Sequence, residues 1–132
     1  MAGALASDDF KNFNEQAGKL QTVLPGFANA FADDDQRKKI IDQIKRVGHF
    51  PKAEDLATAR KYFVPFTIAT VEFAKNLRGV AAFKSVKIYQ CPMANQAVPD
   101  APKNGLWIQT EGPLRNPFFG EAMLTCGSEV KL

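Results

Sequence analysis

The sequence predicts a mainly α protein, in which a bundle of three to four helices is followed by a short, irregular segment that contains β-structure. Apolar residues recur at helical spacing through the first two thirds of the chain, whereas short alternating stretches and frequent turn residues follow Gly79. The length of 132 residues fits one domain. Within the single domain 1–132, we assign the helical bundle to residues 7–79 and the strand and loop segment to residues 80–132.

Composition favours a folded core and excludes several classes of protein. A hydrophobic content of 45%, with eleven phenylalanines, is typical of a globular protein and not of a disordered chain. The net charge of +3 is small, and no basic stripe with exposed aromatic residues indicates nucleic-acid binding. No apolar run approaches the roughly 20 residues that cross a bilayer. We expect neither nucleic acid as a partner nor insertion into a membrane.

The first helix is expected to begin at the N-cap cluster Ser7-Asp8-Asp9 and to end at Pro25-Gly26. Its apolar face comprises Phe10, Phe13, Ala17, Leu20 and Leu24. Before it, Ala4-Leu5-Ala6 has the small-x-small form of a signal-peptidase site, although no basic region or apolar stretch precedes it. Two interpretations stay open here: an exported protein whose signal peptide has been removed, or a flexible start.

Two further helices follow. The second is expected from Asp33-Asp34-Asp35, whose carboxylates suit a helix start, to Gly48. The third is expected from Ala53-Glu54-Asp55 to Gly79. Pro65 within it should kink or split the helix, because proline lacks the amide donor and clashes with the preceding turn.

The last third has a different character. Alternation over residues 86–91 and the run Leu106-Trp107-Ile108 predict two short strands. Residues 94–105, with two prolines and a terminal glycine, predict a long surface loop. Asn116-Pro117-Phe118-Phe119-Gly120 predicts a tight bend, which would place the sulfur residues that follow it opposite those that precede the loop.

The sulfur-containing residues gather in two short pairs, Cys91-Pro92-Met93 and Met123-Leu124-Thr125-Cys126, which hold both cysteines and two of the three methionines. Residues two apart share a face in a strand, and residues three apart share a face in a helical turn. Two thiolates and two thioethers form a soft ligand set that selects Cu(I). The sequence therefore predicts a Cu(I) or Ag(I) site formed by Cys91, Met93, Met123 and Cys126.

Several segments together resemble a bacterial domain family of unknown function. The family's motifs C-P-M-A, W-L-Q, R-N-P-Y-F-G and M-L-x-C-G are similar, in the same order, to the segments at residues 91–94, 107–109, 115–120 and 123–127. The segment at residues 59–67 is similar to the family's A-R-x-x-F-x-P-L-S. Phe118 replaces the more usual Tyr, and Thr67 stands where Ser is common. The resemblance spans most of the chain, roughly from Phe10 onward.

Members of that family occur as free-standing secreted proteins and as C-terminal extensions of the periplasmic subunits of copper and silver efflux pumps. The resemblance therefore implies a periplasmic or exported protein that carries copper or silver and hands it to an efflux-pump subunit or another copper carrier. A docking module without metal fits the same context.

Alternatives stay open at each residue. Cys91 and Cys126 also suit a structural disulfide, which would stabilise the fold by about 4 kcal/mol. The methionines also suit core packing against aromatic rings. Trp107 is expected to be a buried anchor, or else a cap over Cu(I). His49, the one histidine, suits a structural place at a helix end better than an accessory metal ligand. No base and orienting group accompany a nucleophile, so we expect no enzyme.

Overall fold

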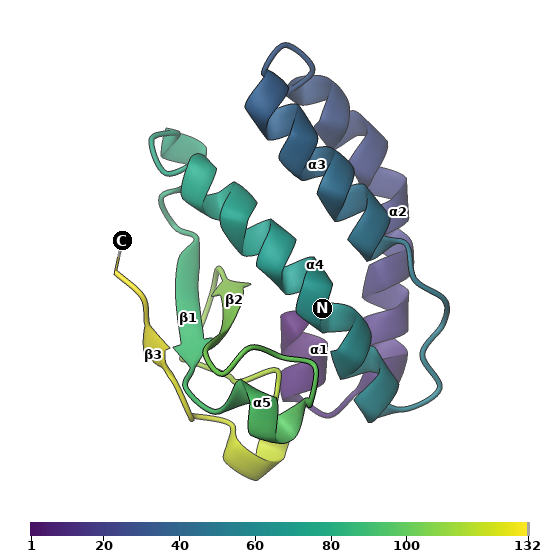
Figure 1. The fold of residues 1–132 in the computed structure, drawn as a ribbon, viewed down its shortest axis with the longest axis vertical. Helices are drawn as coiled ribbons and strands as arrows, with labels where there is room; N and C mark the ends of the chain where they lie inside the picture. The colour runs from purple at the N-terminus through teal and green to yellow at the C-terminus, as the bar shows by residue number, and fades with distance from the viewer. Residues whose placement is uncertain (132) are drawn as a thin grey trace.

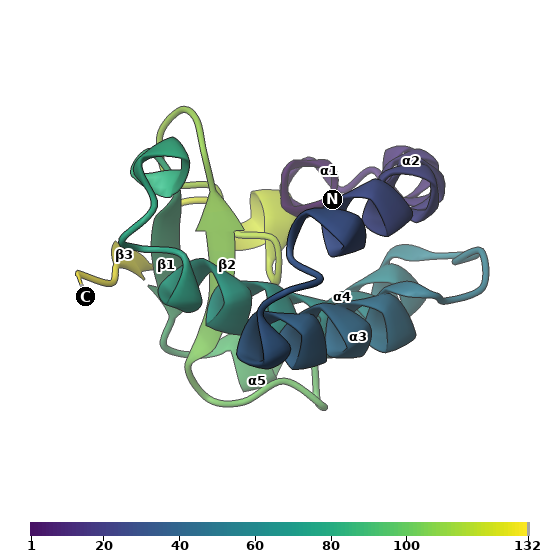
Figure 2. The ribbon, with the colours of Figure 1, turned by 90° about the horizontal axis from the view of Figure 1, so that it is seen from above.

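The computed structural model describes residues 1–131 and confirms the mainly α fold. Helices α2 and α3 lie side by side, α4 packs against α3, and a small sheet covers the other side of α4 (Figures 1 and 2). The helices are α1 (Ala2–Ala6), α2 (Phe10–Ala30), α3 (Asp35–Gly48), α4 (Leu56–Asn76) and α5 (Ala94–Ala97), with 3-10 helices η1 (Ala81–Phe83) and η2 (Gly120–Met123). The strands are β1 (Lys87–Cys91), β2 (Gly105–Gln109) and β3 (Ser128–Glu129).

Helix α2 begins where the sequence predicts, because the Asp9 side chain accepts a hydrogen bond of 2.9 Å from the amide of Asn12. The predicted end at Pro25-Gly26 is wrong, since the helix continues to Ala30. The reason is tertiary packing: the ring of Phe27 lies 5.2 Å from that of Phe73 on α4. Burial of this aromatic group outweighs the local cost of proline and glycine in the helix.

The segment Ala4-Leu5-Ala6 is not a flexible start. All three residues are buried within α1. The guanidinium of Arg60, on α4, donates a hydrogen bond of 3.0 Å to the carbonyl of Leu5. A helix of one turn is unstable alone, so these long-range contacts hold it in place.

Helices α3 and α4 begin at aspartate caps. Asp34 accepts a hydrogen bond from the amide of Arg37 at 3.0 Å, and Asp55 accepts one from the amide of Thr58 at 2.7 Å. Helix α4 continues through Pro65, which is exposed, so the predicted split does not occur. Helix α4 supplies the surface on which the rest of the molecule packs.

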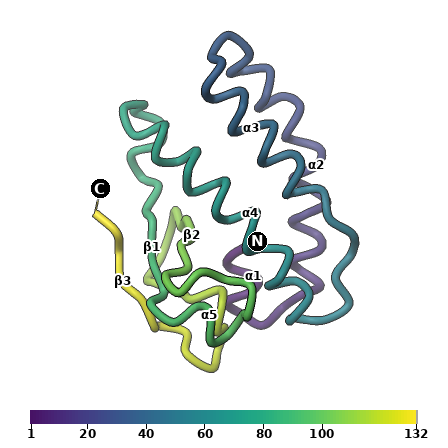
Figure 3. The backbone as a smooth tube through the Cα atoms, in the orientation of Figure 1, coloured from purple at the N-terminus to yellow at the C-terminus, as the bar shows by residue number. Residues whose placement is uncertain are grey.

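The sheet has the order β2-β1-β3, with β1 antiparallel to both neighbours. Strand β3 was not predicted from the sequence; its residue Ser128 pairs with Gln90 of β1. Helix α5 lies within the stretch that the sequence assigns to a long loop. Figure 3 shows how the C-terminal part of the chain returns beside β1. This return brings Cys126 close to the strand that carries Cys91.

Contacts between α4 and the sheet anchor the C-terminal segment. The Thr67 hydroxyl donates a hydrogen bond of 2.9 Å to the carbonyl of Leu106 on β2. The ring of Phe63 lies 6.1 Å from that of Phe118. Both α4 residues belong to the segment at 59–67 that sequence analysis singled out, so this segment is the surface on which the sulfur-bearing part of the chain rests.

Candidate functional site

Cys91 lies at the end of the central strand and is fully buried. Its partner across the ladder is Gly105 of β2. A Cβ atom at Gly105 would lie 2.4 Å from the Cβ of Ala94 and 2.8 Å from the ring of Phe118. Glycine at this position therefore lets α5 and the ring of Phe118 pack closely against β2, opposite Cys91 in the ladder.

Cys126 lies in a turn, not in a strand. Its amide donates a hydrogen bond of 3.1 Å to the carbonyl of Met123. The next residue, Gly127, has a φ of 144°, and a Cβ there would lie 2.6 Å from the carbonyl oxygen of Gln90. Because glycine alone tolerates this conformation and this close approach, Gly127 brings the backbone beside Cys126 against strand β1.

The two cysteines are free and lie near each other, because Ser128, two residues after Cys126, pairs with Gln90, next to Cys91. The two thiols are close enough to affect each other's ionisation. Burial, with smaller effects from the neighbouring Cys91, raises the pKa of the Cys126 thiol above its ordinary value. The metal-free pair thus favours the protonated form of Cys126, and a bound cation would have to displace a proton from it.

The two methionines differ in their surroundings. Met93 is partly buried and packs against the hydrophobic core. Strand β1 ends at Cys91, so the strand-face argument for Met93 is wrong: this residue lies in the turn that leads into α5. Met123 ends η2 and is 40% exposed. Met123 and Cys126 belong to one turn, as the sequence predicts, since the amide of the second bonds to the carbonyl of the first.

Asn116 holds the turn that carries Met123 and Cys126, and sequence analysis assigned this segment a geometric role without finding the side chain responsible. Its fully buried carboxamide donates a hydrogen bond of 2.7 Å to the carbonyl of Cys126. Its oxygen accepts hydrogen bonds from the amides of Phe118 at 2.8 Å and Phe119 at 3.2 Å. The backbone amide of Asn116 also donates to the carbonyl of Leu124 at 2.7 Å.

An ion pair ties the same segment to the N-terminal helix. The guanidinium of Arg60 contacts the carboxylate of Asp8 and donates a hydrogen bond of 3.0 Å to the carbonyl of Pro117. The second carboxylate oxygen of Asp8 accepts a hydrogen bond of 3.3 Å from the amide of Glu121. Gly120, with a φ of 62°, leaves no room for a Cβ beside this pair. Sequence analysis noted Arg60 in a motif but did not predict its partners.

Trp107 is a fully buried anchor, the first of the two roles weighed for it. Its ring stacks on Tyr89 with centroids 5.6 Å apart. A Cβ at Gly127 would lie 3.1 Å from this ring, so the indole lies directly beside the backbone that follows Cys126. A role as a cap over a metal stays a prediction.

His49 is exposed at the end of α3. Its ring nitrogen Nδ1 lies 3.3 Å from the side-chain oxygen of Gln21 on α2. The end of α3 lies on the side of α4 that faces away from β1 (Figure 1). The structure therefore groups His49 with α2 and not with the sulfur residues.

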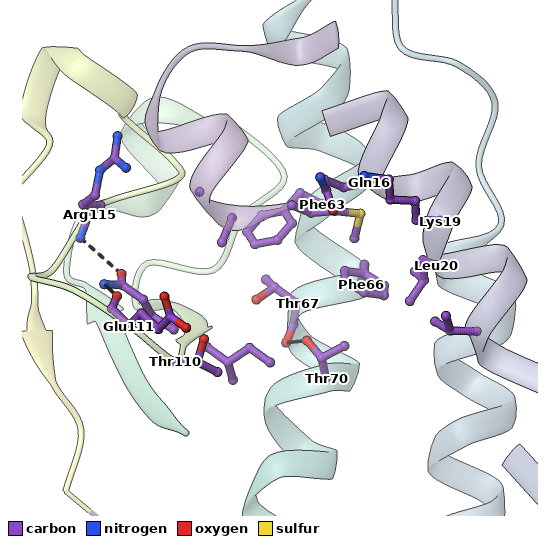
Figure 4. A pocket seen from close by; sticks show the side chains of 16 residues that line it. Gln16, Lys19, Leu20, Phe63, Phe66, Thr67, Thr70, Thr110, Glu111 and Arg115 are labelled. Carbon is purple, nitrogen blue, oxygen red and sulfur yellow. Dashed lines mark hydrogen bonds between the residues drawn. The ribbon is translucent and has the colours of Figure 1, made fainter. Parts of the chain in front are cut away.

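Two hollows in the surface lie apart from the four sulfur residues. One, of about 660 Å³, lies between α2, α4 and β2; Phe63, Phe66 and Leu20 face it (Figure 4). Arg115 and Glu111 stand at its other side, where the amide of Arg115 bonds to the oxygen of Gln109 at 3.3 Å. Another, of about 880 Å³, lies beside His49. The polar groups Thr67 and Thr70 in the first hollow already bond to backbone carbonyls.

Within residues 1–131, no three side chains of His, Cys, Asp and Glu come together in a group that could hold a metal ion. Across the same residues, no helix is both long and apolar enough to pass through a membrane.

Comparison with known proteins adds no assignment. The chain matches no protein-family model, no curated protein and no solved structure.

Proposed function

We propose that the chain binds one Cu(I) or Ag(I) ion through the sulfur atoms of Cys91, Met93, Met123 and Cys126. The observation that carries the proposal is the proximity of two free cysteines, each with a methionine two or three positions away. Soft monovalent ions prefer thiolate and thioether ligands, whereas hard cations prefer oxygen. No oxygen ligand is needed at this site.

The four sulfur atoms have different expected roles. Cys91 is buried in the sheet and is the fixed anchor. Met93, two residues further along the chain, is partly buried against the hydrophobic core. Cys126 is partly exposed and Met123 is more so. A soft ion is passed on by stepwise ligand exchange, so an incoming ligand replaces Met123 first and Cys126 second.

The expected setting follows from the family that the sequence resembles. We propose an exported, periplasmic protein or domain that carries the ion in copper homeostasis or efflux. An efflux-pump subunit or another copper carrier would be the partner. The protein performs no catalysis in this proposal, because binding and transfer of an ion need no nucleophile or general base.

The direct test is titration of fully reduced protein with Ag(I), and with Cu(I) in competition with a chromophoric chelator, followed by native mass spectrometry. We expect one ion per chain. Met93→Leu and Met123→Leu should each weaken binding about tenfold or more without unfolding, because Met and Leu are similar in volume. His49→Gln is the matched control and should leave affinity unchanged. A reduced chain that takes up no ion contradicts the proposal.

The second candidate is a disulfide-stabilised helical module that binds another protein of an efflux system and no metal. The same proximity of Cys91 and Cys126 favours it, because neighbouring cysteines in an exported protein readily pair. Intact mass after thiol alkylation of the protein as purified separates the two. Two alkyl groups per chain would support the metal site. A chain that takes up no alkyl group as purified, and binds no ion after reduction, would support the disulfide module.

A further inference from the structure

The two cysteines that lie near each other at the end of β1 are unequal in access. Cys91 is fully buried and pairs with Gly105 of β2, which lies against Ala94 of α5. Cys126 is partly exposed, and the pairing of Ser128 with Gln90 brings it beside Cys91. A reagent from solution therefore meets Cys126 first, and a group attached there lies within reach of a second thiol.

We propose that this pair is a thiol–disulfide exchange site, at which Cys126 reacts with a low-molecular-weight disulfide and Cys91 resolves the product. An accessible thiol beside a buried one suits a two-step exchange. In the first step the accessible thiol attacks the small disulfide, and in the second step the buried thiol attacks the mixed disulfide that has formed. Access, and not thiolate character, favours the reaction at Cys126, since burial raises the pKa of this thiol. Cys126 is partly exposed in a turn held by a few hydrogen bonds, whereas Cys91 is buried in a ladder.

The chemistry balances without any group that the chain lacks. The sulfur of Cys126 forms a bond to one sulfur of the small disulfide, whose other half leaves as a thiol with the proton of Cys126. The sulfur of Cys91 then attacks the sulfur of Cys126, and the second half leaves as a thiol with the proton of Cys91. Two electrons pass from the chain to the small disulfide, and the chain ends with a Cys91–Cys126 bond.

The exchange regulates the metal site, and this step rests on the proposed function. A disulfide sulfur is no thiolate ligand, so oxidation would leave Met93 and Met123 as the remaining ligands. The oxidised chain should therefore release Cu(I) or Ag(I). Conversely, a bound ion occupies both thiolates and should protect them from exchange.

Glutathione disulfide is the probe, applied to reduced, metal-free protein, with acid quenching and intact mass at intervals. Wild type should pass to the internal disulfide. Cys91→Ser should stop at one glutathione adduct, and Cys126→Ser should react at least about tenfold more slowly, since a buried thiol reacts only after local opening. Equal rates for the two variants, or a wild type that keeps its glutathione, would overturn the proposal.

Two further measurements keep the outcome clear. Circular dichroism checks that each serine variant is folded, and Cys91→Ala replaces Cys91→Ser if the buried hydroxyl unfolds the chain. Ag(I) binding to the reduced wild type is measured in parallel. If the internal disulfide forms but Ag(I) does not bind, the exchange site is supported and the proposed metal binding is overturned. If Ag(I) binds but glutathione disulfide does not react, metal binding is supported and the exchange site is overturned.

Discussion

The two sulfur pairs are held in opposite ways. Cys91 sits in the central strand, where it is fully buried and held by backbone pairing with Gly105. Cys126 sits in a turn whose position depends largely on one carboxamide, that of Asn116. The side of the candidate site that carries Cys91 is therefore part of a paired sheet, whereas the side that carries Cys126 is a turn held by few hydrogen bonds. Such a turn is the side that would move during the proposed exchange of ligands.

Removing the carboxamide that holds the exposed side should have the largest effect. Asn116→Ala deletes three side-chain hydrogen bonds and leaves the carbonyl of Cys126 and two amides without partners. We expect a loss of about 3 kcal/mol of unfolding free energy, measured by urea denaturation. Alkylation of Cys126 should become faster at the same time.

Asn14→Ala is the matched control in the helical half. The Asn14 carboxamide likewise bridges backbone groups, since it bonds to both the amide and the carbonyl of Ala53. The loss should be about 1 kcal/mol because the site is less buried, and the alkylation rate of Cys126 should not change. An equal rate change in both variants would show that Asn116 has no special relation to the sulfur turn.

Adding one methyl group should act in opposite directions in the two halves. Gly105→Ala places a Cβ against Ala94 and Phe118, and overpacking of this kind costs about 2 kcal/mol. Gly18→Ala adds a Cβ on the exposed side of α2, where nothing lies within 4 Å, and should stabilise by about 0.8 kcal/mol. Melting temperatures of the two variants check the sign.

The smallest expected effect is a pH dependence in the helical half. Hydrogen bonds from the amide and the side chain of Thr58 lower the pKa of the Asp55 carboxyl. The stabilising effect of the carboxylate is therefore present above its unfolded pKa and is lost as the pH falls below about 4. Asp55→Asn keeps a capping oxygen but has no carboxyl group to protonate, so the unfolding free energy of the variant should fall less steeply in acid than that of the wild type. Equal pH dependence of the unfolding free energy in the two proteins would contradict this.

Local patterns predicted much of the helical half. Apolar spacing and the aspartate caps place α2, α3 and α4 near their observed starts, because these signals act within one or two turns. The end of α2 escaped prediction since it depends on Phe27 meeting Phe73, far along the chain. The same holds for α1, which Arg60 holds through the carbonyl of Leu5.

The sequence predicts which four residues form the candidate site but not the contacts that position them. Of the four, the structure brings Cys91 and Cys126 near each other, and the predicted bend at Asn116 matches the turn that precedes Met123. The hydrogen bond from the Asn116 side chain to the carbonyl of Cys126 was not predictable, because it joins residues ten positions apart through a buried side chain. Strand β3 has two residues, too few for any alternation to be read.

A crystal structure of the reduced protein soaked with Ag(I), with the ion located by its anomalous scattering, tests the metal site most directly. The account predicts one silver ion bonded to the Sγ atoms of Cys91 and Cys126 and to the Sδ atoms of Met93 and Met123. Silver bound elsewhere, or two thioethers that lie apart from an ion held by the thiols alone, would contradict it.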